Sequence, residues 1–227
     1  MSAAAQPPRP LAILGGTFDP VHLGHLRAAW EAAAQLGAEV RLLPARTPPH
    51  RPQPVASPAQ RVALLRASLA GQGRLTLDLS ELQRDGPSYM VDTLAGLRRE
   101  IGAERPLVLL VGNDAFAGLA TWHRWRELFA HAHLGVLTRP GENAAWPQVL
   151  ADECSARRRD DLGSLRSVPS GCVFELHITA LDISASAIRA LLARGELPHY
   201  LMAEAALEPA LLEPYLAGTG DQGPGTG

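Results

Sequence analysis

Short apolar runs alternate with helix-patterned segments along almost the whole chain. Six of these runs are typical of strands buried in a sheet: residues 11–14, 40–43, 75–79, 106–111, 134–138 and 173–177. Helices are expected between them, with the clearest patterns in residues 24–36, 57–70, 89–101 and 184–193. This alternation through short loops predicts an α/β fold with a doubly wound parallel sheet, in which ligands bind at the carboxyl ends of the strands.

The chain has 227 residues, of which 46% are hydrophobic, and this is enough for one domain with its own core. We expect a flexible N-terminus over residues 1–10, a single domain over residues 11–217 and a disordered tail over residues 218–227. The charge-rich residues 139–170 look irregular, as is typical of a solvated surface. The apolar residues 197–216 predict a small C-terminal helical part that packs either on the domain or on a partner subunit of a homo-oligomer.

One helix start is marked locally by three residues. Ser57 can cap the helix, Pro58 fits its first turn, and Gln60 can reach back to complete a capping box. We therefore expect this helix to begin directly after Ser57.

The basic residues exclude several kinds of chemistry. All 21 of them are Arg, and the absence of Lys excludes Schiff-base catalysis by lysine, a lysine general base and the lysine-containing phosphate loop. Any phosphate must therefore be held by Arg, His or backbone amides. The net charge of −2 argues against a nucleic acid polymer as a partner.

The two cysteines, Cys154 and Cys172, lack the spacing of a CxxC motif or a metal site and are expected to be reduced thiols. The N-terminal residues do not have the pattern of a signal peptide. No apolar run approaches the roughly 18 residues that a membrane span requires. These observations predict a cytoplasmic protein that has no membrane partner.

Polar clusters follow the carboxyl ends of the predicted strands. They are residues 15–25, which read GGTFDPVHLGH, residues 50–51 in a proline-rich loop, residues 112–114, and residues 184–189. Because the carboxyl ends of parallel strands lie at one edge of the sheet, we expect these clusters to converge. Glycines in the first cluster allow a phosphate or ribose to approach the backbone, although its spacing is not that of a dinucleotide-binding loop.

His22 and His25 lie three residues apart at a helix start, which places both rings on one face of the first turn. A pair with this spacing also occurs as half of a metal site, or by chance on a protein surface without any function. No third ligand or HExxH glutamate stands nearby, which disfavours zinc. Beside a helix N-terminus, whose amides and dipole attract anions, two imidazole donors favour a site for a phosphoryl group.

Several segments together resemble one enzyme family. GGTFDPVHLGH and ISASAIR are similar to the two signatures of the HxGH nucleotidylyltransferases, which have a Rossmann-like fold. TPPHRPQP, DGPSYMVDTL, VGNDAF with TWHRW, and DISASAIR resemble, in this order, segments of bacterial nicotinate-nucleotide adenylyltransferases. The resemblance covers about residues 11–195. It implies an enzyme that transfers AMP from ATP to nicotinic acid mononucleotide, giving deamido-NAD and pyrophosphate in NAD biosynthesis.

The resemblance implies that the catalytic residues are His22, His25 and Arg189, with His25 stabilising the pentacoordinate α-phosphorus and Arg189 binding the β and γ phosphates. The ATP-binding residues that it implies are Gly15, Gly16, Thr17, Phe18, Gly112, Asp114, Ser184 and Ser186. Gly112 and Asp114 would hold the ribose. From the residues alone, Ser184 is equally explained as a helix cap, and Arg189 as a surface residue of a short helix.

The resemblance also implies a site for the acceptor mononucleotide, formed by His50, Arg51, Tyr89, Trp122 and His123. His50 and Arg51 lie in the loop expected to cover the acceptor phosphate. Trp122 offers a face for the pyridine ring, although a single Trp is often a core residue.

The family has Thr where this chain has Met90, and that Thr is expected to help bind the carboxylate of the substrate. This difference puts one acceptor contact in doubt. The backbone amide of His123 is the alternative donor.

The reaction that the resemblance implies is an in-line attack of the acceptor's 5′-phosphate oxygen on the α-phosphorus of ATP, which needs no protein nucleophile. Mg²⁺ would be carried by the ATP phosphates, because no carboxylate cluster is present in the sequence to hold it. No protein metal site is expected.

Two alternatives stay open. A non-catalytic nucleotide-binding regulator with the same fold would bind ATP without releasing pyrophosphate. An HxGH transferase with a different acceptor, such as phosphopantetheine, would lack the TWHRW and PPHR segments. Class I tRNA synthetases share an HxGH signature, but the chain is short for one and has no Lys for their second motif.

Overall fold

The computed structural model describes residues 8–46, 53–84, 86–141 and 146–216. Within these residues, six parallel strands form one sheet with the order β3-β2-β1-β4-β5-β6. The strands are β1 (Leu11–Gly16), β2 (Glu39–Pro44), β3 (Leu75–Leu77), β4 (Leu107–Gly112), β5 (His133–Thr138) and β6 (Val173–His177). The predicted doubly wound α/β fold is confirmed.

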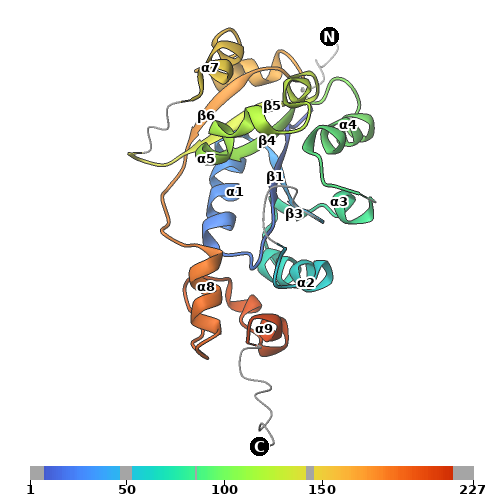
Figure 1. Ribbon diagram of the computed structural model, residues 1–227. Helices are drawn as coiled ribbons and strands as arrows, with labels where there is room; N and C mark the ends of the chain where they lie inside the picture. Colours follow the sequence, from blue (N-terminus) through green and yellow to red (C-terminus); the bar gives the residue numbers. More distant parts are fainter. Residues whose placement is uncertain (1–7, 47–52, 85, 142–145, 217–227) are drawn as a thin grey trace, which may run out of the picture.

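Helices cover both faces of the sheet (Figure 1). One face packs against α1 (Leu23–Leu36) and α2 (Pro58–Leu69), and the same buried cluster continues below the sheet into α8 (Ala185–Leu192) and α9 (Pro209–Leu216). The other face packs against α4 (Met90–Ile101), α5 (Asn113–Ala117), α6 (Leu128–His131) and α7 (Gln148–Ser155). A short helix, α3 (Ser80–Gln83), and four 3₁₀ turns complete the described elements: η1 (Leu119–Thr121), η2 (Trp125–Glu127), η3 (Leu162–Arg166) and η4 (Glu204–Ala206).

The two faces are built from alternate residues of each strand. In β1, Ala12 and Leu14 belong to one buried cluster, and Leu11 and Ile13 belong to the other. Successive side chains of a strand point to opposite faces, so a strand that is apolar at every position must be covered on both sides. The unbroken apolar runs of the sequence are explained by this double burial.

The sheet reverses its direction of growth at β1. Leu14 pairs with Leu42 of β2 on one side and with Leu110 of β4 on the other, and the chain reaches β4 only after it has formed β2 and β3. The carboxyl ends of β1 and β4 therefore flank the switch point, where open α/β sheets bind ligands. Gly16 ends β1 and Gly112 ends β4.

Two local predictions are confirmed in detail. Ser57 caps α2 in a capping box: its hydroxyl accepts from the Gln60 amide, and Gln60 Oε1 accepts from the Ser57 amide. Ser184 caps α8, accepting at 3.2 Å from the amide of Ala187.

The expectation that residues 139–170 are irregular is wrong. They contain α7 and the 3₁₀ turn η3. Leu150 and Cys154 of α7 are buried against the sheet, one turn apart. The helix was concealed because it is short, starts after Pro147 without a polar cap and runs into a charge-rich segment.

The apolar C-terminal stretch packs on its own domain. Leu212 and Tyr215 of α9 are buried in the cluster that also holds α1, α2 and α8. Figure 1 shows α8 and α9 together below the sheet, at the end where α1 begins. Among the described helices, no segment is long and apolar enough to cross a membrane.

Candidate functional site

The first turn of α1 brings two imidazoles together. His22 is the N-cap residue, and its backbone N–H donates to Nδ1 of His25 at 3.4 Å. The two rings stack with centroids 3.7 Å apart, and Phe18 packs edge-on against His25 with centroids 5.0 Å apart. Because Nδ1 of His25 accepts this bond, a neutral His25 carries its proton on Nε2. The predicted juxtaposition of His22 and His25 is confirmed.

His22 is a buried imidazole with an unused polar atom. Only 7% of the residue is exposed, and Nδ1 has no hydrogen-bond partner within the described part of the chain. Burial, and in second place the charge of Arg139, lower the pKa of His22 to about 4. The ring is therefore neutral at pH 7. A buried polar atom without a partner costs about 1–3 kcal/mol, and a bound ligand atom would remove that cost.

Arg139 is a residue of the site that the sequence did not single out. It follows β5 directly, so it lies at the carboxyl edge of the sheet, and its charge acts on the buried ring of His22. The available signal was its position, since it is the first residue after a predicted strand and so lies at the edge of the sheet where ligands bind.

Two glycines leave room for the rings. A Cβ on Gly24 would lie 3.0 Å from Cε1 and Nδ1 of His22, and a Cβ on Gly16 would lie 2.9 Å from the ring of Phe18. Phe18 itself has a φ of 52°, a left-handed conformation that is uncommon for a residue with a large side chain. The backbone from Gly16 to His25 is thus folded tightly around its own aromatic side chains.

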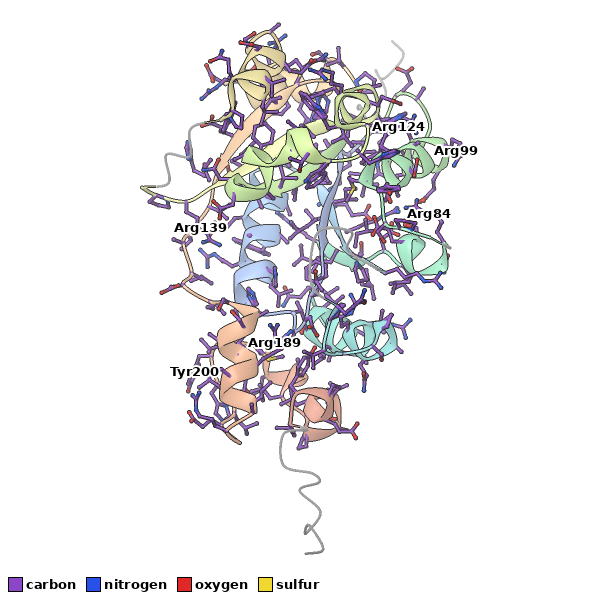
Figure 2. All side chains as sticks on the ribbon, in the orientation of Figure 1. Arg84, Arg99, Arg124, Arg139, Arg189 and Tyr200 are labelled. Atoms are coloured by element: carbon purple, nitrogen blue, oxygen red, sulfur yellow. The ribbon has the colours of Figure 1, made fainter. Side chains whose placement is uncertain are left out.

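The start of α8 lies beside the start of α1. A Cβ on Gly24 would be 3.8 Å from Cβ of Ile183, just before α8. From the second turn of α8, Arg189 reaches back to donate from Nη1 to the backbone oxygen of Asp19 at 2.6 Å. Figure 2 shows Arg189 beside α8, below the sheet. The polar clusters after β1 and β6 therefore converge, as predicted, and two helix N-termini meet there.

The remaining residues predicted to bind ATP lie at the same edge. Thr17 is half-buried, and Gly15 and Gly112 are exposed at the ends of adjacent strands. A Cβ on Gly112 would meet no protein atom within 4 Å, so this glycine borders open space. Asp114 is exposed in the first turn of α5. The hydroxyls of Ser184 and Ser186 lie 3.2 Å apart, which brings these two predicted residues together at the exposed start of α8.

The residues predicted to bind the acceptor are partly brought together. The rings of Tyr89 and His123 stack with centroids 4.3 Å apart. Trp122 is half-buried and packs against the core cluster on the α4 side of the sheet. Met90 reaches the end of β1, where its Cε would lie 3.0 Å from a Cβ on Gly15.

The loop predicted to cover the acceptor contains His50 and Arg51, and both lie outside the described residues. The chain on its N-terminal side is well anchored. The amide of Arg46 donates to Ser88 Oγ, and Arg46 Nη1 donates to the carbonyl of Arg84. The loop therefore starts beside the segment that carries Tyr89.

Nothing in the described part of the chain resembles a metal centre. No group of three His, Cys, Asp or Glu side chains there is placed to hold a metal ion. The donors around α1 and α8 are imidazoles, a guanidinium and amides, which suit phosphate oxygens better than a hard cation. These residues do not fit a protein-held Mg²⁺ site.

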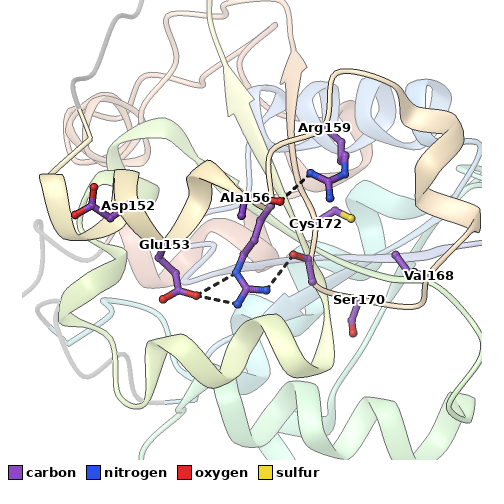
Figure 3. Close-up of a pocket in the computed structure, with 9 residues that line it drawn as sticks. Asp152, Glu153, Ala156, Arg159, Val168, Ser170 and Cys172 are labelled. Carbon is purple, nitrogen blue, oxygen red and sulfur yellow. Dashed lines mark hydrogen bonds and ion pairs between the residues drawn. The ribbon is translucent and has the colours of Figure 1, made fainter.

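A surface pocket of about 560 Å³ lies elsewhere, at the amino end of β6 (Figure 3). It is lined by two acidic and two basic side chains, so its formal charge is balanced. Arg157 pairs with Glu153 at 2.8 Å and contacts the carbonyl of Gly171, and Arg159 donates to the carbonyl of Ala156 at 2.9 Å. This balance gives the pocket no preference for a charged ligand, so the switch-point edge remains the better candidate site.

The chain is similar to known proteins over most of its length. A family model described as cytidylyltransferase-like matches residues 13–191. A "probable nicotinate-nucleotide adenylyltransferase" of Dechloromonas aromatica is 49% identical over 203 residues, which cover 88% of this chain and 94% of that protein. A protein of the same name from Halorhodospira halophila is 49% identical over 202 residues, which cover 88% of this chain and 92% of that protein.

A solved structure shows the same fold. The nicotinic acid mononucleotide adenylyltransferase of Plasmodium falciparum, complexed with NaAD, superposes with a TM-score of 0.63. The alignment covers 92% of this chain and 96% of the other, with 14% sequence identity. At this identity the match supports the fold alone.

Proposed function

The chain belongs to the nicotinate-nucleotide adenylyltransferase family, and from this premise we propose that the residues around the starts of α1 and α8 transfer AMP from ATP to nicotinic acid mononucleotide. The products are deamido-NAD and pyrophosphate, so the enzyme acts in NAD biosynthesis. The observation that carries the location is the convergence of His22, His25 and Arg189 at the switch-point edge of the sheet.

The triphosphate of ATP would lie between the two helix starts. His22 and His25 present imidazole donors at the N-terminus of α1, and Arg189 comes from α8 with a fixed positive charge. Ser184 and Ser186 place the amides of the first turn of α8 beside the β and γ phosphates. With its proton on Nε2, His25 donates to an oxygen of the α-phosphorus as that group gains charge.

The nucleoside would follow the carboxyl ends of β1 and β4. Gly15, Gly16, Thr17 and Phe18 line the base and the phosphate from the β1 side, where the absence of side chains on the glycines allows close approach. Gly112 borders open space at the end of β4, and the exposed carboxylate of Asp114 can accept from the ribose hydroxyls.

The acceptor would lie on the side of β1 that faces α4. The stacked rings of Tyr89 and His123 form one wall, Trp122 adds an aromatic face, and the amide of His123 is the candidate donor to the carboxylate. His50 and Arg51 remain our candidates for its phosphate. Met90 replaces a hydroxyl with a thioether, so this wall has one polar contact fewer than the family pattern.

The chemistry is one in-line displacement. An oxygen of the acceptor's 5′-phosphate forms a bond to the α-phosphorus, while the bond from that phosphorus to the β-phosphate oxygen breaks and pyrophosphate leaves. The protein positions both partners and neutralises charge, which the neutral His22, the donor His25 and the cation Arg189 are suited to do. Mg²⁺ would arrive on the ATP phosphates.

A coupled pyrophosphate assay tests the function. ATP with nicotinic acid mononucleotide should release pyrophosphate at a rate that depends on both substrates, and nicotinamide mononucleotide in parallel measures acceptor preference. Binding of ATP without release of pyrophosphate would identify a non-catalytic regulator. Release with phosphopantetheine, and not with the mononucleotide, would identify a different acceptor.

Location and assembly are separate proposals. Both cysteines are buried free thiols, which suits the reducing cytoplasm predicted from their spacing. A homo-oligomer stays a prediction, and light scattering of the purified chain tests it.

A further inference from the structure

The buried carboxylate of Asp19 joins segments that are far apart in the sequence. Asp19 is 7% exposed. Its Oδ2 accepts from the amide of Val55 at 2.8 Å, and its Oδ1 accepts from the amide of Ala56 at 3.0 Å and from the hydroxyl of Tyr215 at 2.8 Å. One side chain of the loop before α1 thus anchors the segment that leads into α2 and the last helix, α9.

Asp19 also determines where Arg189 lies. Nη1 of Arg189 donates to the Asp19 carbonyl at 2.6 Å and stays 3.9 Å from Oδ2, outside hydrogen-bond distance of the carboxylate. In the part of the chain that the structure describes, Asp19 is the only hydrogen-bond acceptor for Arg189. Arg189 is therefore oriented by a single residue, and its other N–H groups have no acceptor among the described residues.

Besides Arg189, a second cation, Arg61, interacts with the charge of Asp19. This guanidinium is completely buried, its Nη1 donates to the carbonyl of Thr17 at 2.7 Å, and its charge interacts with Asp19 and Tyr215. A carboxylate that is already balanced by Arg61 and by three hydrogen bonds attracts Arg189 less strongly. The charge of Arg189 thus remains available to a phosphate.

The ring of Tyr215 fills space in the core, and its hydroxyl makes a separate contact with Asp19. The residue is 5% exposed, and burial followed by the nearby charge of Asp19 raise the pKa of Tyr215, so the phenol stays a proton donor. It is the residue through which α9 contacts Asp19. The backbone carbonyl of Leu201, also in the C-terminal part, accepts from the first amide of α1, on Leu23, at 2.8 Å.

We propose that Asp19 and Tyr215 are positioning residues that hold Arg189 in place for the ATP phosphates, so that the C-terminal helix α9 takes part in catalysis without contacting substrate. This inference rests on the proposed role of Arg189. Removal of the Tyr215 hydroxyl takes one hydrogen bond from the Asp19 carboxylate, which then attracts Arg189 more strongly. Arg189 leaves the Asp19 carbonyl and forms a direct ion pair with the carboxylate. ATP then binds more weakly, while the acceptor is affected little.

The test is steady-state kinetics of Tyr215→Phe, which removes one oxygen and keeps the ring in the core. We expect KM for ATP to rise about tenfold, which is the low end of the effect expected when a hydrogen bond to a charged group is lost. KM for the mononucleotide should change by less than about twofold. Tyr200→Phe is the matched control, because Tyr200 is 90% exposed and should leave both constants unchanged. Thermal melting shows that each variant is folded.

A double-mutant cycle with Arg189→Ala separates positioning from a general structural effect. If Tyr215 acts through Arg189, Tyr215→Phe raises KM for ATP in the parent chain and has no further effect in the Arg189→Ala chain. An equal rise in both chains, or equal rises for both substrates, would overturn the proposal. If Arg189→Ala raises KM for ATP and Tyr215→Phe does not, the positioning pair is wrong and the site stands. If Arg189→Ala has no effect, the assigned role of Arg189 is wrong as well.

Discussion

The imidazole of His22 stacks on that of His25 at 3.7 Å between centroids, with an interplanar angle of 26°. His22 is buried and neutral at pH 7, because burial and Arg139 lower its pKa to about 4. A neutral ring can lie this close to a second imidazole without repulsion between like charges, and it can still donate one hydrogen bond. The pair therefore presents directed donors to a phosphate.

Substitution of His25 tests its assigned role. In His25→Ala, we expect turnover to fall by a factor of about 100 to 1,000, the usual cost of removing one preorganised donor from a developing oxyanion. The ring is half-buried, so the free energy of unfolding should change by only about 1 kcal/mol. Pyrophosphate release and chemical denaturation measure the two effects. His131→Ala, in α6 just before the amino end of β5, serves as the control, and unaltered turnover in His25→Ala would refute the assignment.

Gly24 is expected to matter because of the space beside His22. A Cβ there would lie 3.0 Å from two atoms of a buried ring that has little room to move, so Gly24→Ala should displace His22. Small misplacements at a reacting centre lower rates by up to about 100-fold, and we expect a fall of about 10- to 100-fold in kcat.

The matched control for Gly24 is Gly96→Ala in α4. The nearest atom to a Cβ on Gly96 is Nη2 of Arg99, at 4.0 Å, and this side chain is exposed. That variant should keep its kcat and gain about 0.5–1 kcal/mol in stability, as for Gly to Ala within a helix. Equal kcat values for the two variants would show that the position of His22 does not depend on Gly24.

Arg98 is predicted to be important for stability and not for catalysis. Its guanidinium donates to five backbone carbonyls, those of residues 102, 103, 105, 131 and 169, so it ties α4 to two loops and to the end of α6. Arg98→Ala should lower the free energy of unfolding by about 3 kcal/mol and Tm by roughly 6–12 °C. KM values measured on folded protein should not change.

The neighbouring Arg99 provides the comparison, because it is exposed on the same helix (Figure 2). We expect Arg99→Ala to melt within about 2 °C of the parent chain. If both variants melt together, the carbonyls around Arg98 are satisfied by water when the side chain is removed.

Stability should fall in acid through two buried histidines. His133 accepts from the amide of Cys172 at 3.1 Å on Nδ1, so its proton is on Nε2, which donates to the carbonyl of Val168. Burial lowers the pKa of His133 to about 4, as it does for His22. Both groups have folded-state pKa values below the unfolded value of about 6.5, so their stabilisation is complete above pH 6.5 and is lost as the pH falls towards 4.

The expected loss is on the order of 3 kcal/mol for each histidine, from roughly 1.4 kcal/mol per pKa unit. Urea denaturation at several pH values measures it. In His133→Asn, the slope of the unfolding free energy against pH between 6.5 and 4 should be smaller by the equivalent of about one proton. His199→Asn, at an exposed position, should keep the slope of the parent chain. Parallel curves for the parent and His133→Asn would contradict the assignment.

Much of the fold could be predicted because the responsible forces are local or repeat along the chain. The apolar run of β4 requires burial on both faces. Ser57 and Gln60 form a capping box, so four consecutive residues are enough to indicate where α2 starts. α7 was missed because its stability comes from the burial of Leu150 and Cys154 against the sheet, which has no local signal. The 4-residue helix α3 was missed because it is too short to show a helical pattern.

The sequence by itself determined the alternating elements, the His22–His25 pair on one helix turn and the family to which the chain belongs, because each depends on residues that are near one another or match in order. Only the tertiary structure showed that burial and the charge of Arg139 lower the pKa of His22, and that Tyr215 bonds to Asp19. The last contact joins residues 196 positions apart. Spacing along the chain carries no information about such a pair, because burial and the crossing of distant segments create the contact.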